Sequence, residues 1–140
     1  MKALGSHVIA ELSHCQPDVL ANLERVQEAM IRAAKEARAT VREVAFHKFY
    51  PHGVSGVVVL SESHIAIHTW PEFGYAAIDV YTCGGHTDPW RACEFLAGVF
   101  GSKTMSTTVV ERGVPTPFGT YNHVVSASRH DTGRLVSNAS

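Results

Sequence analysis

The sequence lacks the features that mark membrane, secreted and nucleic-acid-binding proteins. Its 140 residues include only three cysteines, at positions 15, 83 and 93, which are too few and too scattered for a disulfide framework. No apolar run approaches the roughly 20 residues that span a bilayer, and the first residues contain no signal-peptide core. Twelve basic and 13 acidic residues give a net charge of −1, with no block of one sign. These absences argue against nucleic acid or a membrane as partner and predict a cytoplasmic protein.

The composition that remains is that of an ordinary folded domain. Hydrophobic residues make up 45% of the chain and charged residues 18%, which excludes wholesale disorder. A chain of this length can form one core without a disulfide or a metal. We expect a single domain over residues 1–112 and a loosely ordered tail over 113–140, where periodicity ends and Ser, Thr, Asn and Gly dominate from residue 126. The unusual feature is a set of nine histidines.

Periodicity predicts two helices and several short strands. Apolar residues recur at three- and four-residue intervals from Pro17 to about Arg38, which predicts one long amphipathic helix. Asp88 and Pro89 supply an N-cap and first-turn pair for a second helix that ends near Phe100. Strands are expected at 4–12, 40–49, 57–60, 64–70, 75–83 and 103–111.

These elements predict an α+β fold. Short links between successive strands favour antiparallel pairing, and two helices can cover only one face of such a sheet. The expected architecture is a two-layer sandwich, a mainly antiparallel sheet with two helices on one face. The other face would still carry Val, Ile, Phe, Trp and Tyr side chains, so a second copy of the chain is the simplest cover.

Elementary chemistry leaves the function open. His64 and His68 lie on a predicted strand, where four residues span roughly 13 Å, too far for one zinc ion, and we expect no metal site. The Gly84-Gly85 pair lacks the lysine of a phosphate-binding loop, and no Gly-x-Ser-x-Gly elbow exists. The residues alone therefore indicate an α+β domain with a suggestive set of serine, histidine and cysteine side chains.

A series of motifs carries more information than any single residue. In chain order they are Phe46-His-Lys-Phe49, Gly53-Val-Ser-Gly-Val-Val-Val, Ser61-Glu-Ser-His, Ile67-His-Thr-Trp-Pro-Glu72, Tyr75-Ala-Ala-Ile-Asp79 and Tyr81-Thr-Cys-Gly84. The series closely resembles the bacterial and archaeal S-adenosylmethionine decarboxylase proenzymes. The resemblance covers roughly residues 1–112. Neither the tail after Gly113 nor the Gly85-His-Thr segment matches the family pattern.

The resemblance implies that the chain makes its own cofactor. In that family the serine matching Ser63 attacks the carbonyl of the residue matching Glu62 and exchanges an amide for an ester. Elimination then releases residues 1–62, and the serine becomes a pyruvoyl group on residues 63–140. By the same resemblance His68 is the base for the elimination, and Ser55 assists processing by hydrogen bonding the intermediate.

Roles in turnover also follow from the resemblance. The substrate amine would condense with the pyruvoyl ketone as a Schiff base, and Cys83 would return a proton after carbon dioxide leaves, since a thiol is mostly protonated at pH 7. Phe49 would stack on adenine and Glu72 would bind the ribose hydroxyls. Cys15 and Cys93 are interpreted as structural.

The resemblance implies an autoprocessing decarboxylase of S-adenosylmethionine that serves polyamine (spermidine) synthesis as a homodimer of cleaved protomers. One alternative is the same pyruvoyl chemistry on ornithine or arginine. These substrates have no adenine, so a ring at Phe49 that stacks on adenine would not help to bind them. Another alternative is a non-catalytic α+β binding or regulatory domain. The presence of Ser63, His68 and Cys83 together argues against it.

Overall fold

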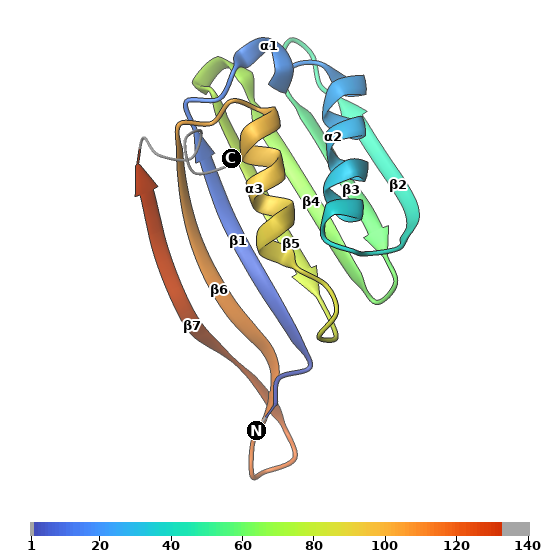
Figure 1. Ribbon diagram of the computed structural model, residues 1–140, viewed down its shortest axis with the longest axis vertical. Coiled ribbons are helices and arrows are strands. Elements are labelled where there is room, and N and C mark those ends of the chain that lie inside the picture. Colours follow the sequence, from blue (N-terminus) through green and yellow to red (C-terminus); the bar gives the residue numbers. More distant parts are fainter. Residues whose placement is uncertain (1, 133–140) are drawn as a thin grey trace.

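A computed structural model describes residues 2–132, which form a two-layer α+β sandwich (Figure 1). One layer is a seven-stranded sheet with the order β2-β3-β4-β5-β1-β6-β7, in which every neighbouring pair is antiparallel. The strands are β1 (Gly5–Ser13), β2 (Val41–Lys48), β3 (Val54–Leu60), β4 (Ser63–Trp70), β5 (Tyr75–Thr82), β6 (Thr104–Pro115) and β7 (Tyr121–Thr132). The predicted fold class is confirmed.

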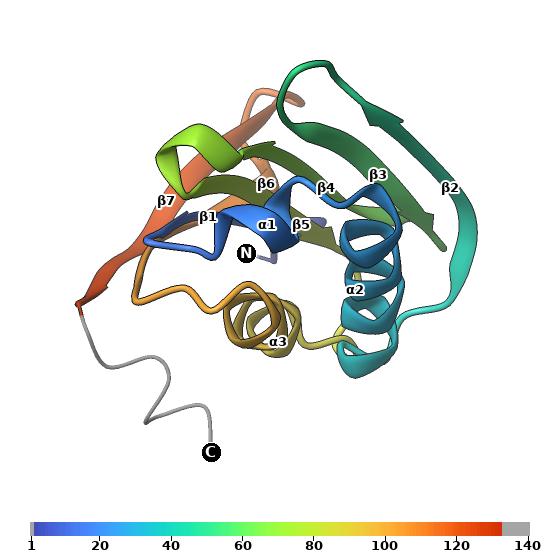
Figure 2. The same ribbon diagram turned by 90° about the horizontal axis from the view of Figure 1, so that it is seen from above.

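The helices form the second layer and lie together on one face of the sheet (Figure 2). They are α1 (Pro17–Leu20), α2 (Leu23–Glu36) and α3 (Pro89–Val99), and a short 3₁₀ helix, η1 (Pro71–Phe73), links β4 to β5. The core lies between the layers, where Met30 of α2, Leu96 of α3 and Ile65 and Ile67 of β4 are all buried in one hydrophobic cluster. None of the helices within residues 2–132 is long and apolar enough to cross a membrane.

The prediction of one uninterrupted helix from Pro17 to Arg38 is wrong. The chain forms α1, leaves helical geometry at Asn22 and begins again as α2. Asn22 has an extended backbone, and its side chain accepts a hydrogen bond from the Arg25 backbone N–H at 3.1 Å. It is the N-cap of α2, a role in which asparagine competes well with helix continuation.

The hairpins differ from the prediction mainly in where strands begin. β3 starts at Val54, so Ser55 lies within a strand and pairs directly with His68 of β4. Gly53 precedes it with φ +82°, and a Cβ at this position would lie 2.8 Å from the Thr69 carbonyl oxygen, so the tight approach to β4 needs glycine. The strand assignment of His64 and His68 is confirmed.

The loosely ordered tail expected from residue 113 is contradicted over residues 121–132. This segment forms β7 and pairs with β6 along nearly its whole length. The described side chains of β7, 121–129, are exposed, so no alternation of buried and exposed residues reveals the strand in the sequence. Its pairing with β6 defines it, together with side-chain hydrogen bonds such as that from Ser126 to the Val109 carbonyl oxygen. Residues 133–140 lie outside the described residues.

The sheet face away from the helices, called the open face below, is covered by no helix of residues 2–132. Along the central strands its side chains are half-buried or exposed, while their sequence neighbours are buried. Its central residues are His7, Ile9, Glu11, His64, Ala66, His68, Trp70, Tyr75, Ala77, Asp79 and Tyr81. It is more polar than predicted, because histidine and carboxylate side chains alternate with the apolar ones.

Candidate active site

The peptide bond between Glu62 and Ser63 lies in the turn that joins β3 to β4. Glu62 has φ +61°, in the left-handed region that costs a non-glycine residue roughly 1 kcal/mol or more. The Ser63 hydroxyl donates to the Ser61 carbonyl oxygen at 3.3 Å. From the end of β5, the Cys83 thiol donates to the Glu62 carbonyl oxygen at 3.0 Å. Glu62, Ser63 and Cys83 are called the cleavage group below.

A cavity of about 280 Å³ adjoins this group. Its walls come from the turn itself, the loop after α2 and the loop before α3. The lining residues are Ala39, Thr40, Ser61, Glu62, Ser63, Cys83, Gly84, His86 and Thr87. Arg38, also with a positive φ, donates from Nε to the His86 carbonyl oxygen at 2.9 Å and so joins the two loops.

The cleavage group is suited to attack on its own backbone. Ser63 supplies a hydroxyl adjacent to the carbonyl of the preceding residue, and the Cys83 thiol polarises that carbonyl by hydrogen bonding its oxygen. The left-handed backbone of Glu62 stores strain that breakage of the peptide bond releases.

The other predicted site residues gather at the opposite end of β4. The Ser55 hydroxyl and His68 Nδ1 are 2.7 Å apart across the β3–β4 pair. A second cavity, of about 290 Å³, contains both of these residues together with Phe49 and Glu72. Trp70, Thr69, His52 and Gly53 complete its lining. Phe49, Ser55, His68 and Glu72 are called the pocket group below.

The structure does not bring the two groups together within one chain. Ser63 begins β4 and His68 lies five residues further along it, a separation of about 16 Å for an extended strand. His68 also points to the open face, while its neighbours Ile67 and Thr69 are buried toward the helices. A base at His68 therefore cannot reach Ser63 of the same chain without a large rearrangement.

Sequence reasoning missed a cluster on the open face beside the cleavage group. His7, His64 and Asp79 place their ligand atoms within 4.8 Å of one another. The Asp79 carboxylate lies 3.7 Å from His7 Nε2 and 3.6 Å from His64 Nε2. Burial lowers the pKa of His7, and the Asp79 carboxylate opposes this shift. The strand alternation puts the three residues on one face, but finding the cluster requires the pairing register of β1, β4 and β5.

This cluster has donors suited to a cation but an unfavourable neighbour. The Arg112 guanidinium lies 3.3 Å from His7 Nδ1, and because arginine can only donate, that nitrogen accepts. The proton of the neutral imidazole is then on Nε2, the atom that a cation would need. The positive charge of Arg112 adds repulsion. The arrangement therefore favours a network of side chains over a metal site.

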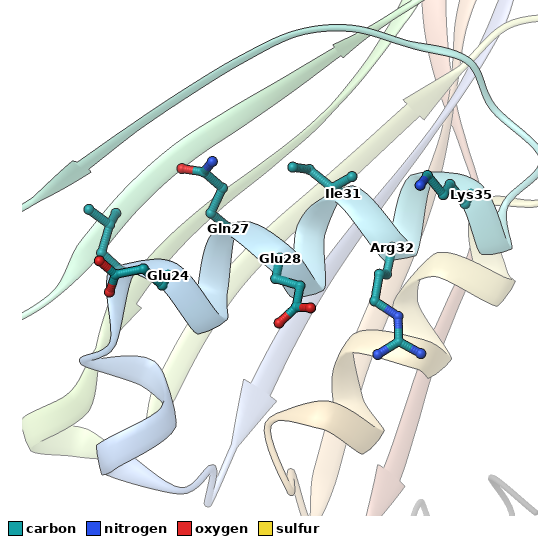
Figure 3. A pocket seen from close by; sticks show the side chains of 7 residues that line it. Glu24, Gln27, Glu28, Ile31, Arg32 and Lys35 are labelled. Atoms are coloured by element: carbon teal, nitrogen blue, oxygen red, sulfur yellow. The ribbon is translucent and has the colours of Figure 1, made fainter.

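A third cavity, of about 660 Å³, lies along α2 (Figure 3). All seven lining residues belong to that helix, and they include Gln27 and Ile31 on one row and Glu28 and Arg32 on the next. It contains none of the predicted site residues.

The fold and the cleavage group together define a class of protein: an α+β sandwich in which a serine hydroxyl and a cysteine thiol lie at the same peptide bond. Comparison with known proteins gives the family. The family model for S-adenosylmethionine decarboxylase matches residues 6–113, and the chain belongs to this family.

Relatives and solved structures agree with this assignment. The chain is 63% identical over 114 residues to the S-adenosylmethionine decarboxylase proenzyme of Carboxydothermus hydrogenoformans, covering 81% of this chain and 90% of the relative. The corresponding proenzyme of Moorella thermoacetica is 56% identical over 117 residues, covering 84% and 94%. The crystal structure of the Aquifex aeolicus adenosylmethionine decarboxylase superposes with a TM-score of 0.77 at 38% identity, over 84% of this chain and 97% of that one.

A more distant structure shares the fold alone. The Trypanosoma brucei AdoMetDC-delta26 monomer matches 84% of this chain and 49% of that chain at 14% identity, with a TM-score of 0.54. The sandwich is thus found in much longer chains of diverged sequence.

Proposed function

We propose that this chain is a proenzyme that cuts its own Glu62–Ser63 bond, forms a pyruvoyl group from Ser63, and then decarboxylates S-adenosylmethionine for polyamine synthesis. The observation that carries the proposal is the hydrogen bond from the Cys83 thiol to the Glu62 carbonyl oxygen, at the bond that the Ser63 hydroxyl would attack. The names of the relatives support the substrate. The three cysteines carry free thiols, which supports a reducing, cytoplasmic setting.

Self-cleavage uses the chain's own atoms throughout. Ser63 Oγ attacks the Glu62 carbonyl carbon, the C–N bond breaks, and an ester replaces the amide, while Cys83 stabilises the charge that develops on the oxygen. Removal of the Ser63 Cα proton by a base then expels the Glu62 carboxylate. Water completes the conversion of the remaining dehydroalanine to a ketone and releases ammonia.

The residues present fit a pyruvoyl group and its substrate. The cavity beside Ser63 leaves room on the side of the thiol. When formed, the pyruvoyl group supplies a ketone that can withdraw electrons from the bond to the substrate carboxylate. Cys83 then acts as the acid that returns a proton to the substrate α-carbon. In the pocket group, Phe49 offers an exposed ring for the adenine and Glu72 a carboxylate for ribose hydroxyls.

We further propose that the working molecule is a homodimer in which each site combines the cleavage group of one chain with the pocket group of its partner. A twofold axis places opposite ends of the same strand against each other, and so generates two identical composite sites. His68 would then act as base on Ser63 of the partner, with its Nδ1 fixed by Ser55 and its other nitrogen available. The open face, with Ile9 and Trp70 exposed on it, would be the contact surface.

The test of this function is the chemistry of the purified protein. We expect intact-mass spectrometry to find residues 1–62 and a 63–140 chain without a free amine, and Ser63→Ala to remain one uncut chain. His68→Ala should stop at the ester, which added hydroxylamine should cleave. The processed protein should release labelled carbon dioxide from carboxyl-labelled S-adenosylmethionine.

Ornithine and arginine serve as competing substrates in the same assay. Release of carbon dioxide from either of these amino acids, with none from S-adenosylmethionine, would show that the substrate is a basic amino acid. A wild-type chain that stays uncut at working pH would contradict self-cleavage altogether.

A further inference from the structure

The turn at the cleavage bond is a hairpin loop of only two residues. Leu60 of β3 pairs with Ser63 of β4, which leaves Ser61 and Glu62 as the loop. The commonest hairpin loops of this length place Asn or Gly where φ is positive. This loop contains neither, and Glu62 still has φ +61°. Contacts from outside the hairpin are therefore needed to hold the turn in its shape.

The segment at the start of β2 supplies two such contacts to Ser61. The Ser61 N–H donates to the Thr40 carbonyl oxygen at 3.2 Å, and Arg42 Nε donates to Ser61 Oγ at 2.9 Å. The carbonyl oxygen of Ser61 in turn accepts the Ser63 hydroxyl at 3.3 Å. Arg42 and the hydroxyl of Ser63 are thus joined through a single residue.

A β-bulge brings Arg42 to this turn. Val41 of β2 pairs with Leu60 of β3, and the next pair joins Glu43 to Val59. Because Leu60 and Val59 are consecutive, Arg42 is an extra residue in β2, which is the edge strand of the sheet. Bulges bend an edge strand and redirect a side chain, and they are frequent beside active sites. The bulge therefore gives Arg42 a direction that regular pairing would not.

We propose that Arg42 is a positioning residue for self-cleavage: its Nε–H holds Ser61 so that the Ser61 carbonyl oxygen keeps the Ser63 hydroxyl beside the bond to be cut. This inference rests on the proposed function, whose first step is attack by Ser63. Since the hydroxyl proton of Ser63 is directed to Ser61, the lone pairs of Oγ are free for the Glu62 carbonyl carbon. The oxygen of that carbonyl is held by Cys83.

The first experiment measures the rate at which the newly made precursor is cut. Arg42→Met retains the length of the side chain without a donor, and it should cut about tenfold more slowly because the nucleophile is less well placed. Arg42→Gln places an N–H donor at the same number of bonds from Cα as Arg42 Nε, and it should cut at nearly the wild-type rate. Retention by glutamine separates the hydrogen bond from the charge.

A double-mutant cycle tests the path through Ser61. Ser61→Ala removes the acceptor and should slow cutting as much as Arg42→Met, while the two changes together should slow it no further. Arg25→Met is the matched control, because it removes the same charge from an exposed position in the first turn of α2. This control should cut at the wild-type rate.

Two further measurements separate positioning from general damage. Hydroxylamine should not accelerate cutting of Arg42→Met, since the slowed step precedes the ester, whereas it should cleave His68→Ala. Arg42 and Ser61 are both exposed, so their bond contributes little to the free energy of unfolding. Urea unfolding of Arg42→Met in the uncut Ser63→Ala protein should therefore match that of Ser63→Ala alone.

The outcomes distinguish this role from the proposed function. A wild-type cutting rate in Arg42→Met, equal slowing in Arg42→Gln, or additive slowing with Ser61→Ala would overturn the positioning role and leave self-cleavage standing. A wild-type chain that stays uncut would overturn both. Cutting that depends on the Arg42 donor, in a protein that releases no carbon dioxide from S-adenosylmethionine, would support the positioning role and reject the decarboxylase.

Discussion

At the scale of single residues, the three cysteines differ by environment and not by chemistry. Cys83 is half-buried at the cleavage cavity, and its thiol hydrogen-bonds the Glu62 carbonyl oxygen. Cys15 and Cys93 lie in the core. The sequence identified Cys83 through its motif and the other two by position.

The buried thiols predict a loss of stability at alkaline pH. Their pKa values rise from 9.0 to about 11 for Cys15 and about 12 for Cys93, mainly through burial. In the unfolded chain the thiols ionise near pH 9, while in the folded chain they stay protonated. Ionisation therefore favours unfolding, and stability should fall as pH rises from about 9, by roughly 1.4 kcal/mol per pH unit for each thiol once the unfolded form is ionised.

Urea unfolding of the Ser63→Ala protein at pH 7 to 10 measures this effect without interference from self-cleavage. Cys93→Ala should roughly halve the slope above pH 9, and Cys83→Ala is the matched thiol deletion outside the core. Equal slopes in the parent protein and in Cys93→Ala would show that the buried thiol does not control alkaline stability.

At the scale of elements, the structure differs from the sequence-based prediction at a helix cap and at an exposed strand. The apolar period predicts α2 but cannot show that Asn22 prefers to cap it. β7 has no buried face among its described side chains, so it leaves no alternation to read. The central strands, with one buried face each, are predicted with correct direction because only one register buries their apolar residues.

The β2–β3 pair gives an element-scale prediction. Phe46 of β2 covers Gly56 of β3, and a Cβ there would collide with the ring. Gly56→Ala should displace Phe46 from the core edge and cost about 1–3 kcal/mol of unfolding free energy. Gly98→Ala is the matched control, because Gly98 is an exposed position in α3 with open space around it, and alanine there should stabilise by about 0.5 kcal/mol.

Denaturant unfolding of both variants in the Ser63→Ala background provides the comparison. Opposite signs are expected for the two substitutions. An unchanged free energy of unfolding in Gly56→Ala would mean that β2 moves at this edge without cost. The Phe46–Gly56 contact would then contribute little to stability.

At the scale of the whole molecule, the cleavage group and the pocket group line two separate cavities along β4. The motifs predicted every member of the cleavage and pocket groups as a candidate, but they contain no information on which end of β4 each member occupies. That division appears only once Ser55 is seen to pair with His68 while Ser63 pairs with Leu60. This division is the reason for the proposal that the two groups of a complete site come from different chains.

Mixed dimers test this assembly directly. We expect a Ser63→Ala chain and a His68→Ala chain to be inactive separately. A heterodimer should unite Ser63 and Cys83 of the second chain with His68 and Ser55 of the first. Random assortment gives about half heterodimers with one complete site of two, and hence about a quarter of the wild-type decarboxylase activity. The chain that acquires a pyruvoyl group, identified by mass, should be the His68→Ala chain only.

The control for this experiment pairs two substitutions from the same group. Ser63→Ala mixed with Cys83→Ala leaves no composite site that contains both Ser63 and Cys83, so decarboxylation should not return. A site contained within a single chain predicts failure in both mixtures, because neither chain of either pair is complete. Recovery with His68→Ala but not with Cys83→Ala therefore requires the cleavage and pocket groups to come from different chains. The separation of about 16 Å between Ser63 and His68 along β4 (about 3.3 Å per residue) explains why.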